Sequence, residues 1–242
     1  MSNEDIITIP SFEGNLSKKI ILIVGQRQSG KTTLIQNLVP TIKKDGDILR
    51  SYLFSDNEQN TIKYKNLGVI DWEPKCLTHD DFAVPINSVL IFEDIMNPRT
   101  FLDKKFRSMV LTARHQNNTI IIAVQSIYDV PPFIRENTNH LFISNANPKL
   151  YETIAKTNIF SSYEEFKCCT DMLTSNYGFM ILSLHGEHPL SIESAVTFYK
   201  VPTKLDKKKK LERIMEQLRE MNLSNGKLDQ AIKLLMDVHK EL

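Results

Sequence analysis

The sequence has few cysteines, almost no net charge and no long apolar run. Its three cysteines, Cys76, Cys168 and Cys169, form no Cys-x-x-Cys motif, so we expect no disulfide framework and a reducing, cytosol-like compartment. Lys and Arg number 30 against 29 Asp and Glu, a formal charge of +1. This balance argues against the class of strongly basic proteins that coat nucleic acid. Any contact with nucleic acid has to come from a local patch or an assembled pore.

Segments that could enter a membrane are also absent from the sequence. No apolar stretch approaches the roughly 18–20 residues that a membrane-spanning helix needs. The first residues are polar and acidic and lack the apolar run of a secretory signal. We therefore expect neither secretion nor insertion into a membrane.

The composition is that of a globular protein, with 41% hydrophobic and 24% charged residues in a chain of 242. A chain of this length can bury the core of one α/β domain. Apolar runs rich in β-branched residues predict buried strands, and residues at helical spacing fill the gaps between them. The predicted strands are 20–24, 52–54, 89–92, 120–124, 141–143, 179–182 and 195–199. This alternation predicts an α/β fold with a mainly parallel central sheet flanked by helices.

The chain divides into three parts. Residues 1–17 are polar and predict an N-terminal arm, and residues 18–202 carry the α/β pattern, ending in a short β addition after residue 145. Residues 203–242 contain the lysine run 207–210 and two amphipathic stretches, which predict a basic C-terminal helical hairpin. The lysine run is either a solvated helix start or a surface that faces DNA or a partner.

Residues 25–32 read G-Q-R-Q-S-G-K-T and satisfy the pattern G-x-x-x-x-G-K-[ST], between a predicted strand and an amphipathic helix. Gly25 and Gly30 allow backbone angles that let successive N–H groups surround a phosphate, and the helix N-terminus adds its positive dipole end. Lys31 supplies a positive charge to the β- and γ-phosphates, and the Thr32 hydroxyl ligates Mg²⁺. The expected nucleotide-binding residues are Gly25, Gln28, Ser29, Gly30, Lys31, Thr32 and Thr33.

Two acidic residues, Glu93 and Asp94, follow the buried strand predicted at 89–92. Ligands bind at the carboxyl edge of such sheets, and neighbouring strand residues point in opposite directions, so we expect two separate tasks. By position, Glu93 takes part in holding Mg²⁺ and Asp94 acts as the base that orients and polarises the attacking water. Ring ATPases usually have Asp before Glu, and the order here is inverted.

Gln125 ends the strand predicted at 120–124, and we expect it beside the γ-phosphate, between the 25–32 loop and the acidic pair. Its amide can donate to phosphate and accept from water, which suits a sensor of hydrolysis. Hydrolysis also needs a positive charge to meet the charge that develops on the phosphoryl group, often from a neighbouring subunit. Arg114 is the first candidate and Arg135 the second. The alternative role for either arginine is to cap a helix or to form a salt bridge.

A basic cluster, Lys104, Lys105 and Arg107, follows the acidic strand. In a ring this cluster could grip DNA phosphates without regard to sequence. The alternative is an exposed helix face with no such role.

Three segments together resemble the viral genome-packaging ATPases of the FtsK–HerA superfamily, and among them the poxvirus-like branch. They are GQRQSGKT (25–32), VLIFEDI (89–95) and ARHQNNTIIIAVQSIYDVPPFIREN (113–137). The resemblance covers about residues 18–145. It implies a RecA-like P-loop ASCE sheet, with Gln125 as sensor and Arg114 as an arginine finger acting on a neighbouring subunit.

The resemblance further implies hydrolysis of ATP with Mg²⁺, coupled to the pumping of double-stranded DNA into a preformed capsid. The implied partners are double-stranded DNA, further copies of the chain in a ring of five or six subunits, and a capsid or portal-vertex protein. The implied location is the host cytoplasm at the assembly site, or the virion. Two alternatives stay open: a small-molecule kinase, and an assembly factor that binds nucleotide without turning it over.

Overall fold

The computed structural model of the chain describes residues 11–64, 67–72, 77, 83–95, 97–174, 178–185 and 192–201. The predicted C-terminal helical hairpin, Cys76 and the first ten residues of the predicted arm lie outside the described residues. The boundaries of the three predicted parts stay a prediction.

A single sheet of eight strands forms the centre of the described part of the chain, in the order β3-β2-β4-β5-β1-β6-β7-β8. The six strands from β3 to β6 are mutually parallel. At the edge beyond β6, β7 pairs antiparallel with β6, and β8 pairs antiparallel with β7. Their bounds are β1 Ile20–Val24, β2 Arg50–Phe54, β3 Val69–Trp72, β4 Ser88–Glu93, β5 Thr119–Val124, β6 His140–Ile143, β7 Gly178–Ser183 and β8 Val196–Lys200. The predicted α/β class with a mainly parallel sheet and a short β addition is confirmed.

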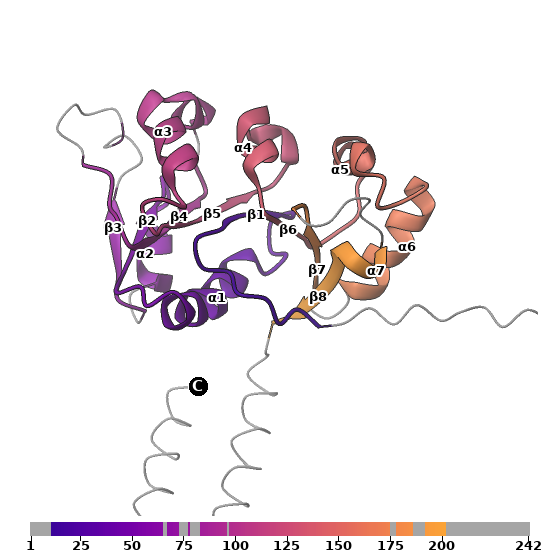
Figure 1. Ribbon diagram of the computed structural model, residues 1–242, viewed down its shortest axis with the longest axis horizontal. Helices are drawn as coiled ribbons and strands as arrows, with labels where there is room; N and C mark the ends of the chain where they lie inside the picture. Colours follow the sequence, from indigo (N-terminus) through magenta and orange to yellow (C-terminus); the bar gives the residue numbers. More distant parts are fainter. Residues whose placement is uncertain are drawn as a thin grey trace, which may run out of the picture. The chain divides into compact units, whose positions relative to one another are not determined.

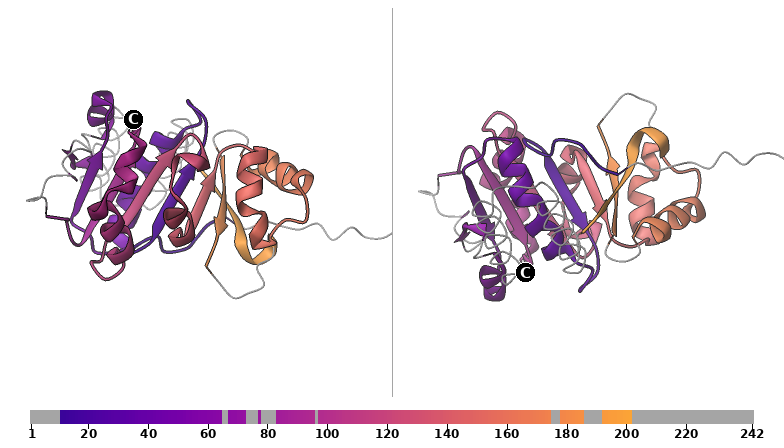
Figure 2. Two further views of the ribbon diagram at one scale, coloured as in Figure 1. Left: turned by 90° about the horizontal axis from the view of Figure 1, so that it is seen from above. Right: turned by 90° about the horizontal axis from the view of Figure 1, so that it is seen from below.

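Helices cover both faces of this sheet, as in a three-layer α/β/α arrangement (Figure 1). α3 and α4 lie over one face, and α1 and α2 lie over the other; the views from above and below in Figure 2 agree. The helices are α1 Lys31–Asp45, α2 Glu58–Tyr64, α3 Lys104–Thr112, α4 Pro132–Asn137, α5 Pro148–Ile154, α6 Tyr163–Leu173 and α7 Ile192–Ala195, with short 3₁₀ helices η3 Pro98–Leu102, η4 Ile127–Asp129 and η5 Ala155–Thr157.

The central strands are apolar on both faces because both faces are covered by helices. Every residue of β1, β4 and β5 is buried. Leu22 and Ile122 belong to the same core cluster as Phe106 of α3. The intervening residue Ile23 points to the opposite face by strand alternation, where α1 packs against β4 and β5. Continuous apolar runs therefore identified these strands correctly.

Two elements between β2 and β4, namely α2 and β3, were not predicted. β3 is an edge strand with a mixed exposure pattern, and it pairs in parallel with β2. Its Trp72 ring stacks on Tyr52 of β2 with centroids 4.5 Å apart. The strand is too short and too polar for periodicity alone, and it forms because β2 offers it a partner.

The described part of the predicted arm lies against the sheet. The backbone N–H of Phe12 donates to the carbonyl of Phe198 in β8 at 2.9 Å, and Leu16 is buried. Among the described residues, no helix has the length and apolar character that crossing a membrane requires.

His140 provides a pH-dependent contribution to stability. Burial lowers the pKa of His140 to about 4, with smaller contributions from the charges of Lys19 and His185. In the unfolded chain, His140 therefore becomes protonated below about pH 6.5. In the folded chain it becomes protonated only below about pH 4. We expect the contribution of His140 to the free energy of unfolding to be constant above pH 6.5 and to fall by at most about 3 kcal/mol between pH 6.5 and 4.

Urea unfolding at a series of pH values measures this effect. In His140→Gln the fall between pH 6.5 and 4 should be smaller, whereas the control His115→Gln, at an exposed histidine, should follow the wild type. An identical slope in the His140 variant and the wild type would contradict the assignment.

Candidate nucleotide-binding site

A pocket of about 1080 Å³ opens at the carboxyl ends of the central strands. It is formed by the 25–32 loop, the start of α1, the acidic pair after β4, the end of β5 and the β2–α2 connection. Of the residues predicted for nucleotide binding and catalysis, those that line it are Gln28, Ser29, Gly30, Lys31, Thr32, Thr33, Glu93, Asp94 and Gln125. The structure thus brings together residues from three separate strands at one edge of the sheet.

Gly30 has a left-handed backbone conformation and is the N-cap residue of α1. Its φ is 88°, a value at which a side chain would be strained, and its carbonyl accepts from the N–H of Leu34 at 2.8 Å. Gln28 also has a positive φ, of 62°. The loop turns sharply into α1, and the unpaired N–H groups of the helix start lie beside the pocket, where they can bind an anion.

Gly25 is needed for a different reason from the predicted one. Its φ is not in the left-handed region, so backbone freedom is not the constraint. A Cβ at this position would overlap the hydroxyls of Ser144 and Ser29. The glycine allows the loop to pass close to the end of β6, which anchors the loop on the β1–β6 pair.

Lys31 folds back over its own loop. Its ammonium donates to the carbonyls of Gly25 at 2.7 Å and Gln26 at 2.9 Å. Burial lowers the pKa of Lys31, and the negative charges of Asp94 and Glu93 oppose this effect. The side chain is therefore held at the loop, facing two carboxylates, in a position to exchange carbonyl contacts for phosphate oxygens.

Glu93 lies almost completely buried between α1 and α2, at 2% exposure. Its Oε1 accepts from the hydroxyl of Thr32 at 2.5 Å, and its Oε2 accepts from the hydroxyl of Tyr64 at 2.6 Å. Burial raises the pKa of Glu93, and the two hydrogen bonds act against this rise. Burial also raises the pKa of Tyr64, so its hydroxyl keeps its proton and remains a donor.

Asp94 has separate partners and a separate backbone conformation. Its φ is 53°, and its Oδ2 accepts from the side-chain amides of Asn57 at 3.2 Å and Asn60 at 3.0 Å. The described residues give no hydrogen bond to its other oxygen. The two neighbouring carboxylates therefore have distinct environments, one facing Thr32 and one facing the β2–α2 connection.

Gln125 lies between the loop and the acidic pair, because β5 pairs with β1 on one side and with β4 on the other. It is exposed and lines the pocket. This is the position in the sheet that the sequence analysis expected.

Arg114 and Arg135 do not line this pocket. Arg114 precedes β5, whereas the pocket lies beyond its carboxyl end, and a strand of this length separates the two by ~20 Å. Its side chain is exposed. Arg114 cannot reach the pocket of its own subunit, so any catalytic role requires another copy of the chain.

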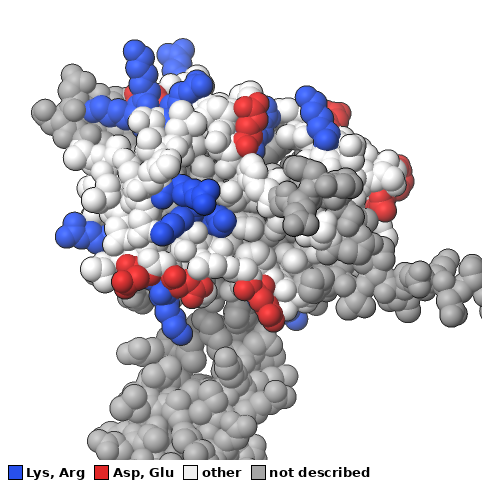
Figure 3. Space-filling view, in the orientation of Figure 1, with Lys and Arg blue, Asp and Glu red and all other residues white. Residues whose placement is uncertain are grey.

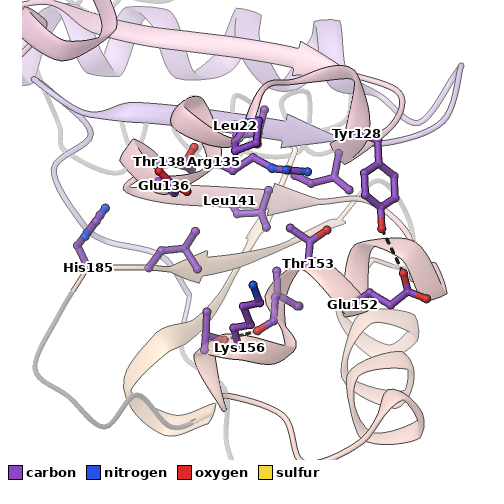
Figure 4. A pocket seen from close by; sticks show the side chains of 15 residues that line it. Leu22, Tyr128, Arg135, Glu136, Thr138, Leu141, Glu152, Thr153, Lys156 and His185 are labelled. Carbon is purple, nitrogen blue, oxygen red and sulfur yellow. Dashed lines mark hydrogen bonds between the residues drawn. The ribbon is translucent and has the colours of Figure 1, made fainter.

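Arg135 belongs to a second cavity, of about 480 Å³, between α4 and α5 (Figure 4). Its guanidinium lies 5.9 Å from the centre of the Tyr128 ring, and the Tyr128 hydroxyl donates to Glu152 at 3.2 Å. Arg135 is thereby occupied away from the nucleotide-binding pocket, which leaves Arg114 as the exposed candidate.

Three contacts at the acidic pair were missed by the sequence analysis: those of Asn57, Asn60 and Tyr64. None of these three residues belongs to the site that the sequence predicts. The i, i+3 and i+7 spacing of these residues places them on one face of a helix, but α2 was not predicted. Which strand that face would meet depends on the tertiary fold.

The pocket fits a nucleoside triphosphate with Mg²⁺. The hydroxyl of Ser29 is buried with no hydrogen-bond partner among the described residues, and it can donate to a phosphate. No group of three or more His, Cys, Asp and Glu side chains gathers in the described ranges to enclose a metal. The pairing of one hydroxyl with one carboxylate suits Mg²⁺, which keeps several waters and shares substrate phosphates.

Three viral proteins are similar to this chain in sequence. Uncharacterized protein 015R of Frog virus 3 (isolate Goorha) is 23% identical over 79% of this chain and 64% of its own length. Uncharacterized protein 075L of Invertebrate iridescent virus 6 is 22% identical over 75% and 77%. Uncharacterized protein L649 of Acanthamoeba polyphaga mimivirus is 27% identical over 64% and 53%. The chain thus spans less than two thirds of the first and third relatives. No protein-family model matches the chain.

Solved structures share the fold. The DNA-packaging ATPase B204 from Sulfolobus Turreted Icosahedral Virus superposes with a TM-score of 0.51 at 15% identity, over 76% of this chain and 98% of that chain. The genome packaging NTPase B204 from Sulfolobus turreted icosahedral virus 2, in complex with AMPPCP, gives 0.52 at 16% identity, over 76% and 97%. The architecture of this chain is therefore that of a P-loop ATPase.

The close approach at Gly25 yields a test of how the 25–32 loop is anchored. Gly25→Ala places a methyl group against Ser144 and Ser29, and such overpacking typically costs about 1–3 kcal/mol. We expect lower thermal stability and weaker binding of an ATP analogue, measured by calorimetry. Removing one obstacle in Gly25→Ala/Ser144→Gly should restore part of both losses, with Ser144→Gly alone as control. If Gly25→Ala matches the wild type in both measurements, the loop does not need this approach.

Proposed function

We propose that this chain is an ATP-driven motor that packages double-stranded DNA into a preformed viral capsid, and that it belongs to the FtsK–HerA type that its sequence resembles, in the poxvirus-like branch. The observation that supports this most is the meeting of the 25–32 loop, the Glu93–Asp94 pair and Gln125 at one pocket. Loop and helix N–H groups for phosphate, two carboxylates in different environments and an intervening amide are what triphosphate hydrolysis requires.

Each residue has a part in the proposed reaction. Lys31 and the 25–32 loop bind the β- and γ-phosphates, while Thr32 and Glu93 hold Mg²⁺. Mg²⁺ bound there would neutralise charge on the phosphate oxygens. Asp94 orients the attacking water and accepts its proton, and Gln125 contacts the γ-phosphate and responds to its loss.

The basic surface of α3 supports contact with DNA. Lys104 is exposed on α3, and Arg99 is exposed on the preceding η3. Arg107 is also exposed on α3, with its guanidinium 5.1 Å from the centre of the Phe133 ring. Figure 3 shows Lys and Arg side chains gathered at the top of this face, where α3 lies in Figure 1. In a ring of five or six subunits these charges would line the path of the DNA and hold its phosphates without reading sequence.

The solved structures with the same fold support the choice of substrate. Of the two B204 proteins, one is a DNA-packaging ATPase and the other is a genome packaging NTPase. The sequence relatives are viral proteins. By this reasoning the further partner is a capsid or portal-vertex protein, and the motor acts at the assembly site in the host cytoplasm or in the virion.

Release of phosphate from ATP with Mg²⁺ and long duplex DNA tests the motor. We expect DNA to stimulate turnover in the wild type. Lys31→Ala should lose ATP binding, whereas Glu93→Gln, Asp94→Asn and Gln125→Ala should retain ATP and lose turnover, by roughly 100-fold or more for Asp94→Asn.

The same assay separates the alternatives. A small-molecule kinase would respond to its acceptor rather than to DNA, and an assembly factor would bind ATP with scarcely any turnover. Wild-type turnover in the doubly substituted Glu93→Gln/Asp94→Asn chain would overturn the assignment of the acidic pair.

A mixing experiment tests the finger proposed for Arg114. Arg114→Ala subunits have an intact pocket, and Lys31→Ala subunits have an intact arginine. Because Arg114 lies beyond the reach of its own pocket, mixtures of these two inactive proteins should regain turnover at the interfaces where they complement each other. Mixtures of Arg135→Ala with Lys31→Ala serve as the comparison between the two candidate arginines. No recovery at any ratio of Arg114→Ala to Lys31→Ala would rule out the finger.

A further inference from the structure

We infer that helix α2 positions the acidic pair: it holds one oxygen of each carboxylate and leaves the other oxygen of each for the reaction. The inference rests on the proposed function and extends it to three residues, Tyr64, Asn57 and Asn60. They are positioning residues, because the hydrogen bonds that carry the inference run from each of them to Glu93 or Asp94.

The first contact is between Tyr64, the last residue of α2, and Glu93. The Tyr64 side chain is almost fully buried, and its hydroxyl donates to Oε2 of Glu93 at 2.6 Å. The other oxygen, Oε1, faces the Thr32 hydroxyl. With Oε2 occupied, Glu93 cannot rotate away from Thr32 without breaking a short, buried hydrogen bond, and Oε1 stays directed at the proposed metal position.

The second contact is between the start of α2 and Asp94. The amide nitrogens of Asn57 and Asn60 both donate to Oδ2. Asn60 is fully buried and its amide nitrogen also contacts the Ser55 hydroxyl at 3.1 Å. Two donors on one oxygen fix the rotation of the carboxylate and leave Oδ1 to accept from water.

The orientation of the Asn57 amide follows from its other end. Its Oδ1 accepts from the backbone N–H of Gln59 at 3.1 Å, in the first turn of α2. With the oxygen used as a helix cap, the NH₂ group has to point toward Asp94. The start of α2 and the carboxylate of Asp94 are thus joined by a single side chain.

α2 is itself tied to α1, which carries Lys31 and Thr32. The Gln36 side chain of α1 donates to the backbone carbonyl of Lys63 in α2 at 2.5 Å. The Lys63 ammonium donates to Oδ1 of Asn60 at 3.1 Å. The positions of both carboxylates are consequently fixed relative to the phosphate-binding residues of α1, and not by β4 alone.

Two variants remove the contacts while preserving packing. Tyr64→Phe keeps the buried ring and removes the donor to Glu93. Asn57→Asp keeps an oxygen that can cap α2, because Asp is as good a helix cap as Asn, but it removes the donor to Asp94 and places a negative charge beside it. Tyr52→Phe is the matched control, since it removes a hydroxyl from another buried tyrosine that contacts neither carboxylate.

We expect kcat of both variants to fall by roughly 10-fold or more, the usual effect of removing a side chain that orients a metal ligand or catalytic group. KM for ATP should stay close to the wild type in Tyr64→Phe, and the temperature of unfolding should stay close to the wild type in both variants. Tyr64→Phe should also need more Mg²⁺ for tight binding of a non-hydrolysable ATP analogue, whereas Asn57→Asp should not. Tyr52→Phe should match the wild type in all of these measurements.

The inference fails if both variants turn over ATP at the wild-type rate, or if the loss of kcat is accompanied by an equal loss of nucleotide binding or stability. It is separable from the proposed function. If the wild type hydrolyses ATP and the variants equal it, only the role of α2 is wrong. If the wild type does not hydrolyse ATP, the motor is wrong, and the Mg²⁺ dependence of analogue binding in Tyr64→Phe still decides whether α2 positions Glu93.

Discussion

The burial of Glu93 between two helices is the constraint on which the site depends. A carboxylate this deeply buried is costly unless its oxygens receive hydrogen bonds. Thr32 from α1 and Tyr64 from α2 supply one donor each. The same two contacts that compensate for burial also join the phosphate-binding helix to the strand that carries the acids, so stability and geometry of the site are coupled.

The sheet places everything else relative to that contact. β5 separates β1 from β4, so Gln125 lies between loop and acids, while the residues before β5 lie at the far edge. Arg114 is therefore excluded from its own pocket, and its side chain is exposed. Arg27, Lys31 and Lys63 line the pocket, and the exposed arginine at the opposite edge of the sheet is the one that we propose acts on another copy of the chain.

Sequence reasoning succeeded where local patterns carry the information. The strands β1, β4 and β5 contain continuous apolar runs because both of their faces are covered. Asp94 after β4 and Gln125 after β5 are polar because these strands end at a pocket. It failed at β3 and α2, which are short and only partly apolar. It also gave the wrong reason for Gly25, whose constraint is Ser144, a residue more than a hundred positions away.

The sequence by itself determined the fold class, the 25–32 loop and the strand ends where acids and amide meet, because these follow from periodicity and from motifs of contiguous residues. The tertiary structure alone decided which groups hold the carboxylates and which arginine is exposed away from the pocket. Those outcomes depend on helices and strands that are distant along the chain and approach each other only when the sheet is assembled. The spacing of residues along the chain does not encode these contacts between distant segments.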